Sequence, residues 1–329
     1  MLECNTSQLA EYMWPFIKSD IPICLIGKTA VGKSEVVHKQ IMPRIAREYG
    51  ESVLHDPRVS TKDVVDGTGI PIIDQEERAT YWTRPAFIPA DDGKMHVMFI
   101  DEFGHATVPM QHLLYGFVNE RALGQWPLPR KNRVILATNE LTDKGGDMKI
   151  LEPLKRRMAW IRVVPDHKSW CSGWAVENGI DPRIIAFIRL RPELFHRPDD
   201  VNPAWPVPPK HEWLNRILKT ETDLKVIQRC ATAISGQAFA AQFIGFLENL
   251  TANLPRLQEI RANPHSARVP QEVQFQYVIA QAIVPHITAK DAAIWAIYLK
   301  RLAPDVASMA AHQAQKVIGQ QKDLQSLII

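Results

Sequence analysis

Apolar residues in the first part of the chain occur in short, nearly unbroken runs separated by longer amphipathic stretches. Such runs are found at residues 23–26, 97–100, 134–138 and 160–164. Runs of this length without polar alternation predict strands that are buried on both faces, as in parallel sheets. Because helical stretches alternate with these runs, the sequence predicts an α/β fold, with a parallel sheet flanked by helices.

The pattern changes after residue 200. Apolar residues then recur at spacings of three and four, which predicts a small bundle of helices, at residues 212–220, 224–234, 236–250, 273–287 and 290–304. The proline-rich segment 191–210 cannot form a regular helix or an inner strand. It therefore predicts a linker between two domains, residues 1–200 and residues 201–329.

Two further stretches of the first domain have their own pattern. Residues 1–20 have the composition of a short amphipathic helix ahead of the first predicted strand. Residues 56–89 are rich in turn-forming residues, which predicts an inserted hairpin. Trp82 in this insertion either packs against the base of the hairpin or presents its ring to a polypeptide.

Composition excludes some classes of protein. The chain has 329 residues, with 46% hydrophobic and 23% charged residues and a net charge of +3. A charge so near neutrality argues against a nucleic-acid partner, and no apolar stretch reaches the ~20 residues that span a bilayer. The cysteines are scattered and form no C-x-x-C pair, so we expect neither disulfides nor a zinc site and expect a cytoplasmic location.

A glycine-bounded loop follows the first predicted strand and precedes a predicted helix. It has the pattern G-x-x-x-x-G-K-S and consists of Gly27, Lys28, Thr29, Ala30, Val31, Gly32, Lys33 and Ser34. Strand, loop and helix in this order are typical of a P-loop, whose backbone N–H groups surround nucleotide phosphates. In this interpretation Lys33 reaches the β- and γ-phosphates and Ser34 ligates Mg²⁺. The alternative is a chance match to a short glycine pattern.

Polar residues follow two later strands. Asp101 and Glu102 follow the strand at 97–100, which we expect beside the strand of the loop. Asp101 would hold Mg²⁺ and Glu102 would orient and deprotonate the attacking water. Asn139 follows the strand at 134–138 and can hydrogen-bond the γ-phosphate or that water. The alternatives are a helix cap for the two carboxylates and an ordinary turn for the amide.

Two arginines lie in the segment LEPLKRRMAW. Either Arg156 or Arg157 can act in trans, as an arginine finger on the nucleotide of a neighbouring subunit. The alternative is a basic surface cluster without a role in catalysis.

These motifs, in this order and followed by a helical region, resemble those of AAA+ ATPases. Within that superfamily the chain resembles the MoxR group, of the dynein-related AAA type. Three more segments carry the resemblance, DVVDGTGIP at 63–71, FIDEFGHATVPMQHLLYGFVNERALGQWPLP at 99–129 and ISGQAFAAQFIGFL at 234–247. The family's N-R-A triplet is replaced here by residues 104–106, Gly-His-Ala.

The resemblance implies a function and a set of site residues. It implies an ATPase that uses ATP and Mg²⁺, with residues 27–34 as Walker A, Asp101 and Glu102 as Walker B and Asn139 as sensor 1. Arg157 matches the arginine of the family's P-L-x-x-R-F pattern. Lys210 stands near the place of the sensor-2 arginine of the helical lid, one position out of register.

The resemblance also implies partners. ATP would lie between the two domains, and a finger acting in trans implies a homo-oligomeric ring, a hexamer by analogy. MoxR-like proteins remodel or activate other proteins, often a von Willebrand A-domain partner, so we expect a protein client and no membrane insertion. Two other functions stay open: a nucleic-acid-acting AAA+ motor, and an assembly scaffold that binds nucleotide but hardly hydrolyses it.

Overall fold

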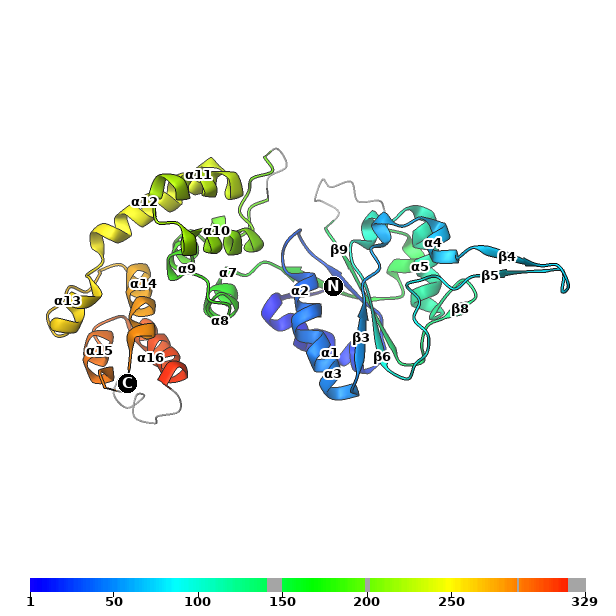
Figure 1. The fold of residues 1–329 in the computed structure, drawn as a ribbon, viewed down its shortest axis with the longest axis horizontal. Coiled ribbons are helices and arrows are strands. Elements are labelled where there is room, and N and C mark those ends of the chain that lie inside the picture. The colour runs from blue at the N-terminus through cyan, green and yellow to red at the C-terminus, as the bar shows by residue number, and fades with distance from the viewer. Residues whose placement is uncertain (141–149, 199–201, 289, 319–329) are drawn as a thin grey trace. The chain divides into compact units, whose positions relative to one another are not determined.

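The computed structural model describes residues 1–140, 150–198, 202–288 and 290–318 (Figure 1). The chain forms two compact units, Met1–Asp166 and His167–Ile329. The division lies earlier than the predicted one near residue 200. The reason is that residues 182–190 belong to the hydrophobic core of the second unit, where the Phe187 ring packs edge-on against Phe239 and Phe243. The proline-rich segment, whose residues 199–201 lie outside the described part, is thus a connection within the second unit.

A six-stranded sheet in which every strand pairing is parallel forms the centre of the first unit. Its strand order is β1-β10-β2-β9-β6-β3. The strands are β1 (Leu2–Asn5), β2 (Ile23–Ile26), β3 (Ser52–His55), β6 (Met95–Ile100), β9 (Asn132–Thr138) and β10 (Ala159–Val164). The predicted parallel sheet is confirmed, whereas β1 and β3 were not predicted, because each is a short edge strand.

The neighbour of β2 differs from the expectation. We expected the strand that precedes Asp101 to lie beside β2, but β9 lies between β2 and β6. Ile26 of β2 pairs with Thr138 of β9, and Ile100 of β6 pairs with Leu136 of β9. Strand order is set by crossover connections, which short apolar runs do not encode.

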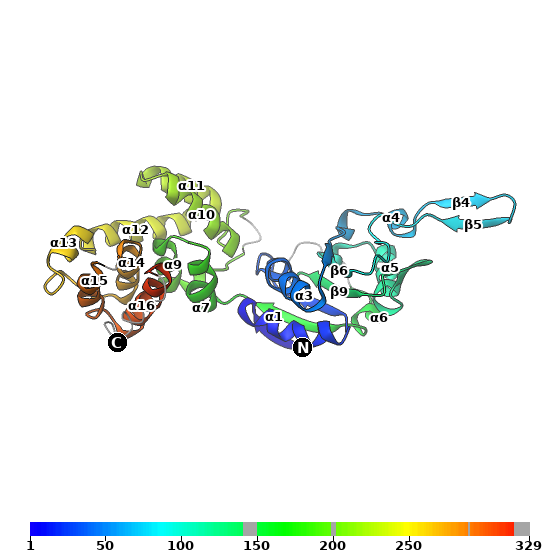
Figure 2. The ribbon, with the colours of Figure 1, turned by 60° about the horizontal axis from the view of Figure 1, so that its bottom comes forward.

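Helices cover both faces of this sheet (Figure 2). Alternate residues of each strand point to opposite faces, so Leu25 and Phe99 pack on one side and Cys24 and Met98 on the other. The first face is covered by α1 (Thr6–Lys18) and by the helix after the loop, which runs as α2 (Lys33–Val36), the π-helical η1 (Val37–Ile41) and α3 (Met42–Tyr49). The second face is covered by η3 (Phe103–His105), α5 (Val108–Asn119) and α6 (Glu152–Lys155).

The turn-rich insertion contains an antiparallel hairpin that projects from the sheet (Figures 1 and 2). It consists of β4 (Pro71–Asp74) and β5 (Ala79–Trp82), after η2 (Val59–Thr61) and α4 (Val64–Thr68). Trp82 is 40% exposed, and its backbone carbonyl oxygen accepts hydrogen bonds from the side chains of Gln125 and Trp126. A second small hairpin, β7 (Ala122–Leu123) and β8 (Trp126–Pro127), thus holds the base of the first.

The second unit is helical. Its helices are α7 (His167–Ser169), η4 (Trp170–Trp174), α8 (Ala175–Glu177), α9 (Pro182–Leu190), η5 (Pro192–Leu194), α10 (Pro208–Thr220), α11 (Leu224–Ser235), α12 (Gln237–Asn253), α13 (Leu257–Ala262), α14 (Val273–Ile283), η6 (Val284–His286), α15 (Ala292–Leu299) and α16 (Pro304–Ile318). One core is rich in phenylalanine around Phe187, and another contains Trp295 and Tyr298. No helix in the described part of the chain is long and apolar enough to cross a membrane.

Candidate functional site

The loop of residues 27–34 connects β2 to α2 through a backbone that needs glycine at two places. A Cβ atom on Gly27 would lie 2.4 Å from the carbonyl oxygen of Val163 in β10, so any side chain would displace the strand. Gly32 has φ +102° and Ala30 has φ 61°, both in the left-handed region. Turns of this kind point successive N–H groups toward one concavity, which favours an anion there.

Lys33 is the first residue of α2, and its side chain folds back over the loop. The side chain is only 6% exposed. Its Nζ donates hydrogen bonds to the carbonyl oxygens of Gly27 at 2.7 Å and Lys28 at 3.2 Å, and to Oδ1 of Asn139 at 3.1 Å. A cation is thus held among neutral oxygens, where it remains able to attract an anion.

Two oxygen-bearing side chains meet beside this ammonium. The Ser34 hydroxyl donates a hydrogen bond to Oδ2 of Asp101, a residue that is only 9% exposed. Oδ1 of Asp101 accepts a hydrogen bond from the backbone N–H of Glu102 at 2.8 Å. Hydroxyl and carboxylate oxygens are the ligands that Mg²⁺ prefers, so the donor set fits this ion.

Glu102 has an unusual backbone and an exposed side chain. Its φ of 53° and ψ of 30° lie in the left-handed region, which costs a non-glycine residue about 1–3 kcal/mol. The helix-cap alternative is wrong for α5, because Thr107 occupies that position and its hydroxyl accepts from the N–H of Met110. Glu102 precedes η3 without making a side-chain cap. The strained turn directs this carboxylate outward at the end of β6.

The arginines of the LEPLKRRMAW segment are both exposed. Nε of Arg157 donates to Oδ1 of Asn119 at 2.7 Å, and Nη1 donates to the carbonyl oxygen of Pro153 at 3.1 Å. The guanidinium carbon also lies 4.6 Å from the centre of the Tyr115 ring. Arg156 contributes a backbone N–H that donates to the carbonyl oxygen of Glu152. The structure therefore distinguishes the two residues, because Arg157 is held in one orientation.

Lys210 lies in the second unit, near the start of α10. Its Nζ donates to the carbonyl oxygen of Pro203 at 2.9 Å and lies 5.1 Å from the centre of the Trp205 ring. Partial burial lowers the pKa of this lysine below its usual range. These contacts hold the ammonium against the loop that precedes α10.

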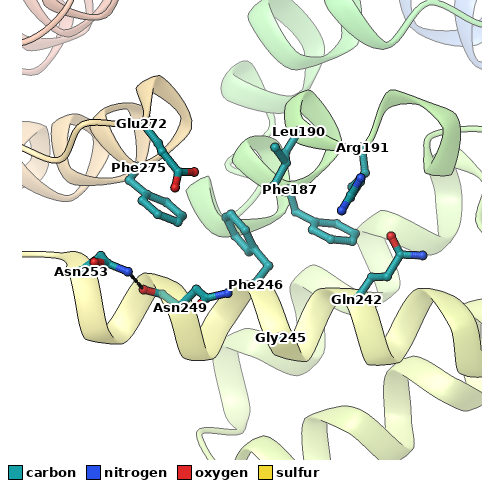
Figure 3. Close-up of a pocket in the computed structure, with 10 residues that line it drawn as sticks. All are labelled: Phe187, Leu190, Arg191, Gln242, Gly245, Phe246, Asn249, Asn253, Glu272 and Phe275. Atoms are coloured by element: carbon teal, nitrogen blue, oxygen red, sulfur yellow. Dashed lines mark hydrogen bonds between the residues drawn. The ribbon is translucent and has the colours of Figure 1, made fainter.

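A cavity of about 300 Å³ lies in the second unit between α9, α12 and α14 (Figure 3). Aromatic rings form much of its wall, and its lining is Phe187, Leu190, Arg191, Gln242, Gly245, Phe246, Asn249, Asn253, Glu272 and Phe275. Figure 3 shows Arg191 and Glu272 far apart across these rings. The lining offers no phosphate-binding loop and no paired catalytic groups, so we assign the candidate site to residues 27–34.

Sequence reasoning did not find several residues that shape the site. Val163 limits residue 27 to glycine through a backbone oxygen, which no side-chain pattern reveals. Asn119 and Tyr115, which hold Arg157, lie on α5, far from Arg157 in the sequence. The only available signal was their spacing of four residues, which places both on one helical face.

Other metal sites are not evident. Within the described residues, no group of three or more histidine, cysteine, aspartate or glutamate side chains is arranged to hold a metal ion.

No known protein-family model matches the chain, and no curated protein matches its sequence. The assignment of a function therefore depends on the motifs and on this geometry.

Proposed function

We propose that the protein is an ATPase of AAA+ type, similar to the MoxR group, that forms a ring and remodels or activates partner proteins. The observation that carries the proposal is the convergence of four side chains from three separate segments of the chain. Lys33, Ser34, Asp101 and Asn139 are joined by the hydrogen bonds from Lys33 to Asn139 and from Ser34 to Asp101. Residues that converge in this way can act on one phosphate group.

Each of these residues has a role that follows from its chemistry. Lys33 would exchange its carbonyl acceptors in the loop for the more negative β- and γ-phosphate oxygens, because a hydrogen bond between charged groups is stronger. Ser34 and Asp101 would hold Mg²⁺, which neutralises charge on the phosphates when bound. Asn139 would exchange its hydrogen bond from Lys33 for one with the γ-phosphate or the attacking water.

Glu102 is the proposed general base. Its carboxylate follows Asp101 directly, and the left-handed backbone turns it away from the buried core. An exposed carboxylate at this position can accept a proton from water that attacks the γ-phosphate. General bases contribute about 10²–10⁴-fold in rate, so loss of this group would nearly stop hydrolysis.

Arg157 is the proposed finger. Its exposed guanidinium lies at the surface of the first unit, where it can meet the nucleotide of a neighbouring copy. A finger acting in trans requires a homo-oligomer, and the family resemblance suggests a hexameric ring. The same resemblance suggests a protein client, with a von Willebrand A-domain protein as one candidate.

Three observations bear on partners and location. The net charge of +3 supports a protein client over a nucleic-acid-acting motor. The cysteines form no disulfide among the described residues and three of them are buried, which supports a cytoplasmic location. A complete set of catalytic groups supports turnover over a scaffold that binds nucleotide without hydrolysis.

Phosphate release from ATP, measured with and without Mg²⁺ and at several protein concentrations, tests the proposal. We expect Mg²⁺-dependent turnover that rises as the ring assembles. Stimulation by DNA or RNA would instead favour the nucleic-acid motor. Tight ATP binding without turnover in the assembled state would favour the scaffold.

A further inference from the structure

Arg157 is an exposed arginine that the structure nevertheless holds in place. The Asn119 amide oxygen accepts from Nε at 2.7 Å, the Pro153 carbonyl oxygen accepts from Nη1 at 3.1 Å, and the Tyr115 ring lies 4.6 Å from the guanidinium carbon. Asn119 is the last residue of α5 and is exposed. Three neighbours therefore fix one long side chain at the surface.

Arg156 is a natural comparison because it is the adjacent arginine and is also exposed. With the residues that the structure describes, its guanidinium forms no hydrogen bond or ion pair. A free arginine side chain carries about 2 kcal/mol of rotamer entropy that is lost when it is ordered. Arg157 has lost much of this freedom before it meets any partner.

The contacts of Arg157 leave part of its guanidinium for a ligand. An arginine has five N–H donors, and the described hydrogen bonds use the Nε–H and one donor of Nη1. Among the described residues, the Nη2 group and the remaining Nη1 donor form no hydrogen bond, so they can bind an anion. Asn119 thus accepts a hydrogen bond from Nε, the guanidinium nitrogen that is bonded to the aliphatic part of the side chain.

We propose that Asn119 is a positioning residue that aims the Arg157 guanidinium at the nucleotide of a neighbouring copy. This inference depends on the proposed function, because it assumes that Arg157 acts in trans. Preorientation matters for the chemical step, since a displacement of about 1 Å can cost about 10²-fold in rate. Asn119 itself touches neither nucleotide nor water in this scheme.

The first test is steady-state hydrolysis by Asn119→Ala. We expect kcat to fall by about 10-fold to 100-fold while the KM for ATP and the melting temperature stay near those of the parent. His112→Ala is the matched control, because His112 is an exposed residue of the same helix and is not one of the three neighbours described for Arg157. It should keep the parent kcat.

The second test asks whether the defect lies in the finger or in the subunit's own site. In rings mixed from Asn119→Ala and Glu102→Gln subunits, the intact Arg157 of a Glu102→Gln subunit can serve the intact site of an Asn119→Ala neighbour. We expect partial recovery of activity. A defect passed along α5 to Asp101 and Glu102 of the same subunit would not recover in trans, and that result would overturn the inference.

The third test is non-additivity. If Asn119 acts through Arg157, then Asn119→Ala should lower kcat no further in an Arg157→Ala background. An additional loss of about 10-fold or more in the double variant would overturn the inference. The inference would also be overturned if Asn119→Ala had the parent kcat while Arg157→Ala was inactive. In that case the proposed function would stand. Parent kcat in Arg157→Ala would instead contradict the proposed finger.

Discussion

The hydroxyl of Ser34 donates a hydrogen bond to the Asp101 carboxylate, although the strands that lead to these residues are not neighbours. Strand β9 lies between β2 and β6. Asn139 follows β9 and contacts Lys33 in the same place. The carboxyl ends of three adjacent parallel strands therefore supply one cluster of polar groups.

Lys33→Ala should weaken ATP binding by about 10-fold to 100-fold, because a hydrogen bond to a charged group contributes about 1.5–3 kcal/mol. The variant would lose the ammonium that bonds Gly27, Lys28 and Asn139. Isothermal titration with ATP and Mg²⁺ measures this change. Lys39→Ala is the control, because Lys39 is an exposed lysine of the same continuous helix that pairs with Glu35. Equal affinity for ATP in Lys33→Ala and the parent would contradict the phosphate-binding role proposed for the loop.

Glu102→Gln should bind ATP with nearly the parent affinity and lose about 10²–10⁴-fold in turnover, since an amide keeps the shape but cannot take a proton. Binding and phosphate release are measured separately on the same preparation. Glu120→Gln offers a comparison, because it changes another exposed glutamate, just after α5. If Glu102→Gln hydrolyses ATP at the parent rate, the general base lies elsewhere.

Arg157→Ala should bind ATP nearly normally and lose about 10³–10⁵-fold in turnover, the usual range for an arginine finger. Rings mixed from Arg157→Ala and Glu102→Gln subunits should regain partial activity, with mixing confirmed by native mass spectrometry. Arg156→Ala is the adjacent control. A large loss in Arg156→Ala with a normal Arg157→Ala would move the role back by one residue.

Lys210→Ala should reduce the compaction that ATP produces, measured by small-angle X-ray scattering, if Lys210 exchanges Pro203 for a γ-phosphate. Lys210→Arg should keep the compaction, because it retains the charge. Lys219→Ala, at the other end of α10, controls for loss of a lysine from that helix. Unchanged compaction and turnover in Lys210→Ala would leave this lysine as a loop contact that bonds Pro203 and lies near the Trp205 ring.

His211 should make the stability of the second unit depend on pH. Its ring is fully buried among Phe195, Phe239 and Trp170, and burial lowers its pKa from 6.5 to about 4. The folded state favours the neutral ring. The contribution of this ring to the free energy of unfolding is therefore complete above pH 6.5 and is lost as the pH falls through 4. The loss amounts to about 3 kcal/mol, at 1.36 kcal/mol for each pKa unit.

Urea unfolding between pH 7.5 and pH 4.5 measures the effect, followed by a signal from the second unit. His211→Phe should flatten the decline relative to the parent, whereas His286→Phe should not, because His286 is exposed. Parallel curves for His211→Phe and the parent would show that other groups cause the decline.

Local features of the sequence were sufficient for much of the first unit. Apolar runs predicted the four inner strands, because a strand buried on both faces must be apolar on both. The loop of residues 27–34 was predictable because its motif is contiguous and Gly32 meets a local need for a left-handed backbone angle. The close approach that restricts Gly27 involves Val163 of the distant β10 and was found only in the structure. The loop and its flanking strand and helix are contiguous, so no distant contact was needed to propose a phosphate site.

Relationships between distant residues were decided only by the tertiary structure. The position of β9 between β2 and β6, the grip of Asn119 on Arg157 and the division after Asp166 all depend on which segments pack together. The proline-rich segment looked like a domain boundary, but the Phe187 side chain has its aromatic partners on α12, beyond those prolines. A linear pattern shows which residues must be buried, whereas their partners are chosen by the packing of the whole chain.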